Sequence, residues 1–477
     1  MPSPSWPRWL APGLVAAAVL LLAVGGAVAF VLLHAPGNVS HPNVEFTAPA
    51  TATTTAATTP AAPKPKPAVI DNFQWPWFGY DAGRTRSFQG DVALHPPLHQ
   101  GWSYDDAGLL EFPPVIDQHT LYLLDDYGYA KAVDVRTGHQ LWVVHVGTSA
   151  AASPAIDVTD QLVMMPVLST NPGPVAGRLP APGNGTFLAL SMQTGRVVWS
   201  HRVPAGTESS PIIAQGTVYF GDQGGTVYAL NAQNGHVEWT YHASGAVKGG
   251  PALVGGVLYF GDYAGRAYAL NATSGHQIWA VGTSGAHFGF GSGNFYATPA
   301  VAFGRVYLGN TDGRVYSFGA RDGALAWATA TGAYVYSSAA VQDTPGLGPT
   351  VYVGSYDGNL YAFNAQSGAI RWTHDAGGKI SGSPTIVDDV VYYSDLASKT
   401  TAGLDARTGR QVFSFPDGLF SPVIADQDAI YLIGRQTIHE LLPAAPKPAA
   451  GPPSATHPSR SHANPPSRQR PRHKSPG

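Results

Sequence analysis

Short apolar stretches separated by glycine-containing turns recur along most of this chain. In four places, alternating aromatic and aliphatic residues flank such a turn: VYFGDQGGTVYAL, LYFGDYAGRAYAL, VYLGNTDGRVYSF and VYVGSYDGNLYAF. Alternation around a tight turn predicts two antiparallel strands rather than a helix. Most of the chain is therefore expected to consist of β-hairpins.

A second recurring segment is eleven residues long. Every copy carries a Gly, and three residues separate this Gly from the Trp or Phe that ends the segment. Its seven copies align without a gap: AVDVRTGHQLW (132–142), ALSMQTGRVVW (189–199), ALNAQNGHVEW (229–239), ALNATSGHQIW (269–279), SFGARDGALAW (317–327), AFNAQSGAIRW (362–372) and GLDARTGRQVF (403–413). The Gly predicts a tight turn that needs positive φ.

A third strand begins at a Pro that usually follows Ser, Thr or Gly. These steps are Ser153-Pro154, Ser210-Pro211, Gly250-Pro251, Thr298-Pro299, Ser383-Pro384 and Ser421-Pro422, with Pro113-Pro114 and Ser338-Ala339 as variants. Each unit therefore holds four strands, the outermost ending in Trp, and repeats about every 40 residues, as propeller blades do.

The blade count follows from the outer-strand positions. Seven are Trp142, Trp199, Trp239, Trp279, Trp327, Trp372 and Phe413. The last unit, from Pro422, supplies only about three strands, and Trp102 stands twelve residues before Pro114, as Trp142 does before Pro154. We expect an all-β, eight-bladed propeller of four-stranded antiparallel blades over 73–442, with the N-terminal strand closing the ring.

These motifs resemble the PQQ-repeat (quinoprotein-like) β-propeller family, in which the Trp packs between blades. The segment WPWFGYDAGRT (75–85) is also similar to the family's N-terminal lead-in. The resemblance implies a structural role for Trp102 through Trp372. It leaves two functions open, since one branch comprises dehydrogenases with PQQ and calcium on the axis and the other comprises cofactor-free scaffolds such as the outer-membrane assembly lipoprotein.

The chain has no cysteine, whereas the quinoprotein alcohol dehydrogenases of the family use a pair of adjacent cysteines beside the cofactor. We therefore expect a non-catalytic propeller with no cofactor and no metal that binds an envelope protein or polymer. The alternative is a divergent PQQ- and calcium-dependent oxidoreductase.

The N-terminal region predicts a membrane anchor. Residues 10–33 carry no charge, and 24 residues of helix span about 36 Å, enough for a hydrocarbon core of about 30 Å. Residues 1–9 would then be cytoplasmic and the rest extracytoplasmic. The small residues Ala27 and Ala29 leave open a cleaved signal, in which case the chain is secreted after residue 29.

The remaining segments differ in composition from the repeats. Residues 34–72 are rich in Thr, Ala and Pro and predict a disordered stalk, and residues 443–477 predict a disordered tail with six Lys or Arg and no acid. Since the whole chain has a net charge of −3, the body is acidic, which argues against a nucleic-acid partner. We expect a monomer.

Candidate binding residues come from departures from the repeat and from loop positions. Insertions at 166–185 and at 282–296, the latter with His287 and Phe288, are expected on one face. Residues three before each strand-opening position should surround the axis on that face. They are Glu111, Ala151, Glu208, Lys248, Tyr296, Tyr336, Ser381 and Leu419, with Lys379 nearby. Such a mouth could bind a polar ligand or a peptide edge.

Overall fold

The computed structural model describes residues 37–49, 74–91, 94–169, 185–283, 293–444 and 477. Within these ranges no helix has both the length and the apolar character needed to cross a membrane. The predicted span 10–33 lies outside the described residues, as do nearly all of the tail and most of the insertion at 166–185.

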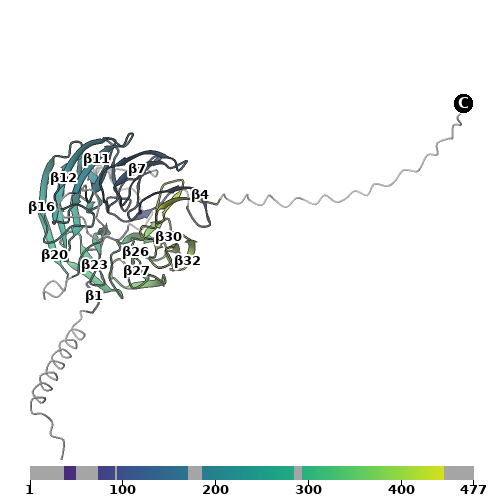
Figure 1. Cartoon of the computed structure of the whole chain (residues 1–477). Coiled ribbons are helices and arrows are strands. Elements are labelled where there is room, and N and C mark those ends of the chain that lie inside the picture. The colour runs from purple at the N-terminus through teal and green to yellow at the C-terminus, as the bar shows by residue number, and fades with distance from the viewer. Residues whose placement is uncertain (1–36, 50–73, 92–93, 170–184, 284–292, 445–476) are drawn as a thin grey trace, which may run out of the picture. The chain divides into compact units, whose positions relative to one another are not determined.

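The described strands form eight sheets, each built on four antiparallel strands. The chain is therefore an eight-bladed β-propeller, as the repeat predicts (Figure 1). Blades one to four contain, from the inner to the outer strand, β5 (Val115–Asp117), β6 (Thr120–Leu124), β7 (Tyr129–Asp134), β8 (Gln140–His145); β9 (Ala155–Asp157), β10 (Leu162–Val167), β11 (Gly185–Ser191), β12 (Val197–Val203); β13 (Ile212–Ala214), β14 (Thr217–Gly221), β15 (Thr226–Asn231), β16 (Val237–His242); and β17 (Ala252–Val254), β18 (Val257–Gly261), β19 (Arg266–Asn271), β20 (Gln277–Gly282).

Blades five to eight follow the same order. They contain β21 (Ala300–Ala302), β22 (Arg305–Asn310), β23 (Arg314–Gly319), β24 (Leu325–Ala330); β25 (Ala340–Thr344), β26 (Gly348–Gly354), β27 (Asn359–Asn364), β28 (Ile370–Asp375); β29 (Thr385–Val387), β30 (Val390–Ser394), β31 (Thr401–Asp405), β32 (Gln411–Phe415); and β33 (Val423–Ala425), β34 (Ile430–Ile433), β35 (Thr437–Pro443), β4 (Leu98–Asp105). The outer strand of blade eight thus comes from the other end of the domain, since β4 pairs antiparallel with β35.

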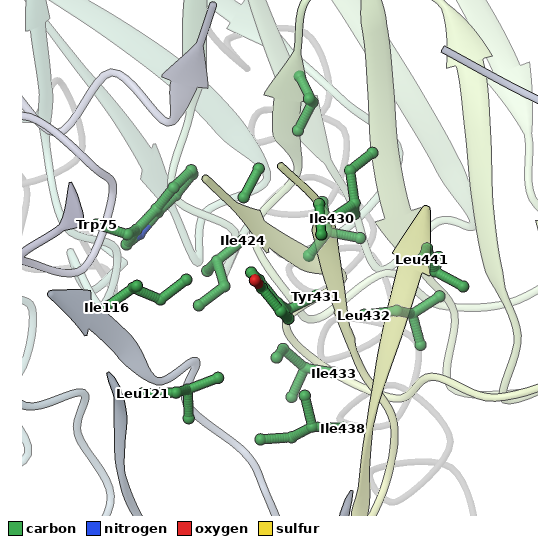
Figure 2. Packing of buried hydrophobic residues seen from close by; sticks show 14 of the residues in the cluster. Trp75, Ile116, Leu121, Ile424, Ile430, Tyr431, Leu432, Ile433, Ile438 and Leu441 are labelled. Carbon is green, nitrogen blue, oxygen red and sulfur yellow. The ribbon is translucent and has the colours of Figure 1, made fainter. Parts of the chain in front are cut away.

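Blade eight also shares its core with its neighbours. One hydrophobic cluster joins Ile116 and Leu121 of blade one to Ile424, Tyr431 and other residues of blade eight (Figure 2). The remaining clusters likewise lie between successive blades. Burial between blades, rather than within a single sheet, therefore holds the blades together.

Seven tryptophans connect seven of the eight blades to the following blade, and blade seven carries Phe413 at this position. Their indole Nε1 atoms donate to backbone carbonyls of the following blade over 2.7 to 3.0 Å, in the pairs Trp102–Val135, Trp142–Met192, Trp199–Ala232, Trp239–Ala272, Trp279–Ala320, Trp327–Ala365 and Trp372–Ala406. The expectation that the outer strand ends in Trp is wrong. Trp199, for example, is the third residue of β12, because pairing with β11 continues beyond it to Val203.

The shared Gly of the repeat lies beneath the tryptophan of the preceding blade. Gly235 has a φ of +70°, and a Cβ there would stand 2.5 Å from the Trp199 ring. The same contact recurs at Gly138, Gly195, Gly275, Gly323, Gly368 and Gly409. The turn conformation and the packing of the indole therefore both require glycine.

Three short strands extend these sheets. β2 (Gln74–Trp75) pairs with the inner strand β5, and β3 (Ser87–Phe88) pairs parallel with the inner strand β29. β1 (Val39–Ser40) pairs with the outer strand β24 of blade five. The prediction of a disordered stalk over 34–72 is therefore wrong for 37–49. Val44 and Phe46 of this segment pack on the core of blade five, an apolar pair too short to stand out in the sequence.

The tryptophan contact can be separated from the cost of positive φ. Gly235→Ala is expected to lower the free energy of unfolding by about 1–3 kcal/mol more than Gly216→Ala does. Gly216 also has positive φ, +78°, but a Cβ there meets nothing within 4 Å. Urea unfolding followed by tryptophan fluorescence measures both variants. Equal losses would show that the indole does not require the glycine.

Candidate binding site at the cavity face

The N-terminal lead-in runs around the inside of the ring, against the inner strands of successive blades. Backbone amides of inner strands or their ends donate to its carbonyls, in the pairs Ile156–Pro76, Leu253–Ala82, Val301–Gly83, Val341–Thr85, Ile386–Arg86 and Asp388–Phe88, over 2.7 to 3.0 Å. These donors come from blades two, four, five, six and seven. The lead-in is thus held by inner strands around the ring and occupies the space between them.

Two buried arginines secure the lead-in. Arg84 donates to the carbonyls of Pro251, Ser210 and Pro211, and Arg86 donates to those of Pro384 and Ser383. Burial lowers the pKa of each guanidinium to about 9. Because their partners are mainly backbone oxygens of the strand-opening steps, these arginines bind the inner ends of blades three, four and seven to the axis.

The residues before the strand-opening prolines form contacts from blade to blade. The hydroxyl of Ser210 accepts from the amide of Ser153 over 3.0 Å, and that of Thr298 accepts from the amide of Gly250 over 2.9 Å. Ser338 and Ser383 serve blades five and six in the same way. The recurring Ser or Thr is thus a hydrogen-bonding position at the inner edge of the ring.

A cavity of about 270 Å³ opens on the axis at the face where the blades are connected. We call this side the cavity face and the other side the opposite face. Five of the predicted site residues line the cavity, namely Glu111, Glu208, Lys248, Tyr296 and Tyr336. Ser381 also lines it, whereas Lys379 is exposed and lies with its Nζ 5.4 Å from the ring centroid of Tyr356. His287 and Phe288 lie outside the described residues.

Tyrosine rings form one side of the cavity. Tyr296 and Tyr336 meet edge to face with centroids 5.6 Å apart, and Tyr336 and Tyr356 lie 4.9 Å apart. Tyr263 extends the row behind the cavity lining, with its ring centroid 6.2 Å from that of Tyr296. Spacing from the prolines missed Tyr356 and Tyr263, because both stand in hairpin turns within blades. Their place in the repeated hairpin motif was the available signal.

Charged and apolar groups form the rest of the lining. The Nζ of Lys248 lies 2.9 Å from Oε1 of Glu208 and 5.1 Å from the ring centroid of Tyr263. The Glu111 carboxylate has no hydrogen-bond or ion-pair partner within the described ranges. Burial, and then the charges of Glu208 and Asp126, raise the pKa of Glu111. The cavity therefore offers one free acid, one neutralised acid and an aromatic wall.

Comparison with known proteins identifies the family. A family model described as outer membrane protein assembly factor BamB matches residues 126–287, 244–344 and 311–438, which together exceed half of the chain. The chain belongs to this PQQ-repeat family. BamB from Moraxella catarrhalis is similar in structure, with a TM-score of 0.57 and 16% identity over 72% of this chain and 97% of that one.

A dehydrogenase of the same architecture is similar as well. Quinohemoprotein alcohol dehydrogenase from Comamonas testosteroni is 29% identical over 163 residues, which are 31% of this chain and only 22% of that relative. Its crystal structure has a TM-score of 0.62 with 13% identity, over 80% of this chain and 82% of that one. The structural likeness to both proteins shows the fold alone.

The family raises the question of whether the axis fits PQQ with calcium. Calcium takes six to eight oxygen ligands, but the cavity lining contains two carboxylates, and Glu208 already accepts from Lys248 and Gln223. Within the described ranges no group of three or more His, Cys, Asp or Glu is placed to hold a metal ion. These residues do not fit a resident calcium ion, and we derive no catalytic step through PQQ.

The raised pKa of Glu111 predicts how the stability of Glu111→Gln depends on pH. Ionising this carboxyl costs more in the folded chain than in the unfolded chain, so it lowers stability at pH values above its raised folded pKa. Glu111→Gln should therefore raise the Tm near pH 7. The gain should vanish below the ordinary pKa of Glu, about 4.3, where both states are protonated.

Glu208→Gln is the matched control, since it leaves Lys248 without its partner and should lower the Tm near neutral pH. Thermal unfolding of both variants across pH measures these differences. A lower Tm for Glu111→Gln at neutral pH would contradict the unpaired state of its carboxylate.

Proposed function

We propose that this chain is an extracytoplasmic, membrane-anchored propeller that binds an envelope protein or polymer with its cavity face and does not catalyse a reaction. The observation that carries this proposal is the cavity itself. It is open on one face, and Arg84 and Arg86 of the lead-in bind the carbonyls of Ser210 and Ser383, which line it.

The lining of the cavity suits recognition. Tyrosine offers a large apolar ring with a polar tip at low entropic cost, and it is enriched at protein interfaces. The lining residues Tyr296, Tyr336 and Tyr356 provide such a surface, and Tyr263 packs against Tyr296 behind them. The free carboxyl of Glu111 can accept a hydrogen bond from a donor group of the ligand.

The fold relatives support two functions, and the alternative keeps one specific observation in its favour. The match to quinohemoprotein alcohol dehydrogenase extends over 163 residues of sequence. The charged residues of the cavity favour the non-catalytic binding function. Lys248 forms an ion pair with Glu208, and a bound cation would need that carboxylate.

A crosslinking experiment tests the binding face. A photoreactive phenylalanine analogue at Tyr336, on the cavity face, is expected to form an adduct in intact cells. The same residue at Arg321, an exposed position on the opposite face of blade five, should form none. Tyr296→Ala should reduce the adduct at least about tenfold, since loss of a central aromatic contact costs about 2 kcal/mol. Adducts from Arg321 alone would overturn the proposal.

The alternative function has its own test. Purified chain mixed with PQQ and calcium is expected to show neither stoichiometric binding nor dye-linked alcohol dehydrogenase activity. Binding and activity that both disappear in Glu208→Gln would establish the oxidoreductase instead. Bovine serum albumin at equal concentration controls for non-specific adsorption of PQQ.

A further inference from the structure

The N-terminal segment 37–49 follows the outer edge of blade five from the cavity face to the opposite face. At its start, Arg314 donates to the Gly37 carbonyl over 3.3 Å, and the Ala330 amide donates to the Asn38 side chain over 3.0 Å. At its far end, the Thr47 amide donates to the Phe303 carbonyl over 2.9 Å. Because β24 runs toward the cavity face and β1 is antiparallel to it, the chain reaches the propeller at the cavity face.

Contacts beyond strand pairing hold this segment. The guanidinium of Arg305 donates to the carbonyls of Val44 and Glu45, and its Cζ lies 5.7 Å from the ring centroid of Phe46. Phe46 in turn packs against Phe303 with centroids 5.9 Å apart. Packing and hydrogen bonds thus hold the described segment 37–49 against blade five, so this segment does not act as a flexible spacer.

Chain length then limits where blade five can stand. Only three residues separate Leu33, the end of the predicted span, from Gly37. Four residue steps extend at most about 14 Å. The headgroup layer on each side of a bilayer is about 5–8 Å thick, so the cavity-face rim of blade five is kept at the membrane surface.

We propose that the lipid surface itself contacts the cavity-face rim of blade five, which comprises Gly37, Asn38, Arg314 and Tyr334. This inference rests on the membrane anchoring proposed above. Tyr334 suits such a contact because 55% of it is exposed on the loop after β24, and amphipathic aromatic rings favour the bilayer interface. Arg314 adds positive charge beside Gly37, which suits anionic lipid.

The contact has a consequence for the binding site. The ring centroid of Tyr334 lies 6.1 Å from that of Tyr336, which lines the cavity. With this rim at the headgroups, the cavity opens toward the bilayer rather than away from it. Its ligand is then met at the membrane surface, as a membrane-bound protein or a lipid-linked polymer would be.

Single-cysteine labelling tests this orientation cleanly, because the chain contains no other cysteine. The full chain with Tyr334→Cys, Arg321→Cys or Tyr127→Cys is labelled with a fluorophore in liposomes of phosphatidylglycerol and phosphatidylcholine carrying headgroup nitroxides. Arg321 is on the same blade but the opposite face, and Tyr127 is on the cavity face of blade one and equally 55% exposed. Quenching is expected to be at least about twofold stronger at position 334 than at either control.

A linker variant separates this contact from anchoring. A Gly/Ser insert of about twelve residues before Gly37 adds ~40 Å of reach, so quenching at 334 should fall to that at 127 while the chain still floats with liposomes. Equal quenching at all three positions in chain that floats would overturn the lipid contact and leave anchoring intact. A chain that does not float would overturn both.

Discussion

One indole packs on one glycine at seven of the eight blade junctions, and this contact sets the positions of neighbouring blades. Each tryptophan covers the turn glycine of the next blade and donates to a carbonyl beside it, as Trp199 does at Gly235 and Ala232. Burial between blades follows from this docking, because each hydrophobic cluster lies in the space that it closes. The inner ends of the blades are thereby placed around one axis, where the binding site is built.

The lead-in binds the inner ends of the blades from inside the ring. Its carbonyls satisfy inner-strand amides, and Arg84 and Arg86 satisfy carbonyls of the strand-opening steps. The remaining opening is bordered by the connections between blades, which contact one another through Ser210 and Thr298 and through the ion pair of Lys248 with Glu208. Tyrosines, Glu111 and Lys248 stand in these connections and line the site. The attachment of 37–49 to blade five would determine which way this face points relative to the proposed anchor.

The repeat made the fold predictable, whereas single-copy segments were not. Blade number, outer tryptophans and the five cavity-lining residues follow from spacing, since spacing in a repeat converts directly into position. Tyr356 was missed because its side chain reaches the cavity from a hairpin turn, and Tyr263 was missed because it contacts the lining residue Tyr296 from another such turn. The docking of Val44 and Phe46 was missed because a two-residue apolar alternation has no periodicity to detect, and only blade five shows that it has a partner.

In the proposed function, the loops around the cavity are the surface that this propeller presents to its ligand. Hydrogen exchange of the full chain, measured with and without isolated envelope membranes, tests it most directly. We expect slower exchange in the cavity-face connections at 205–211, 293–298 and 331–338, with no change in the opposite-face turns at 118–119 and 320–324. Protection confined to those opposite-face turns would show that the ligand binds the other face.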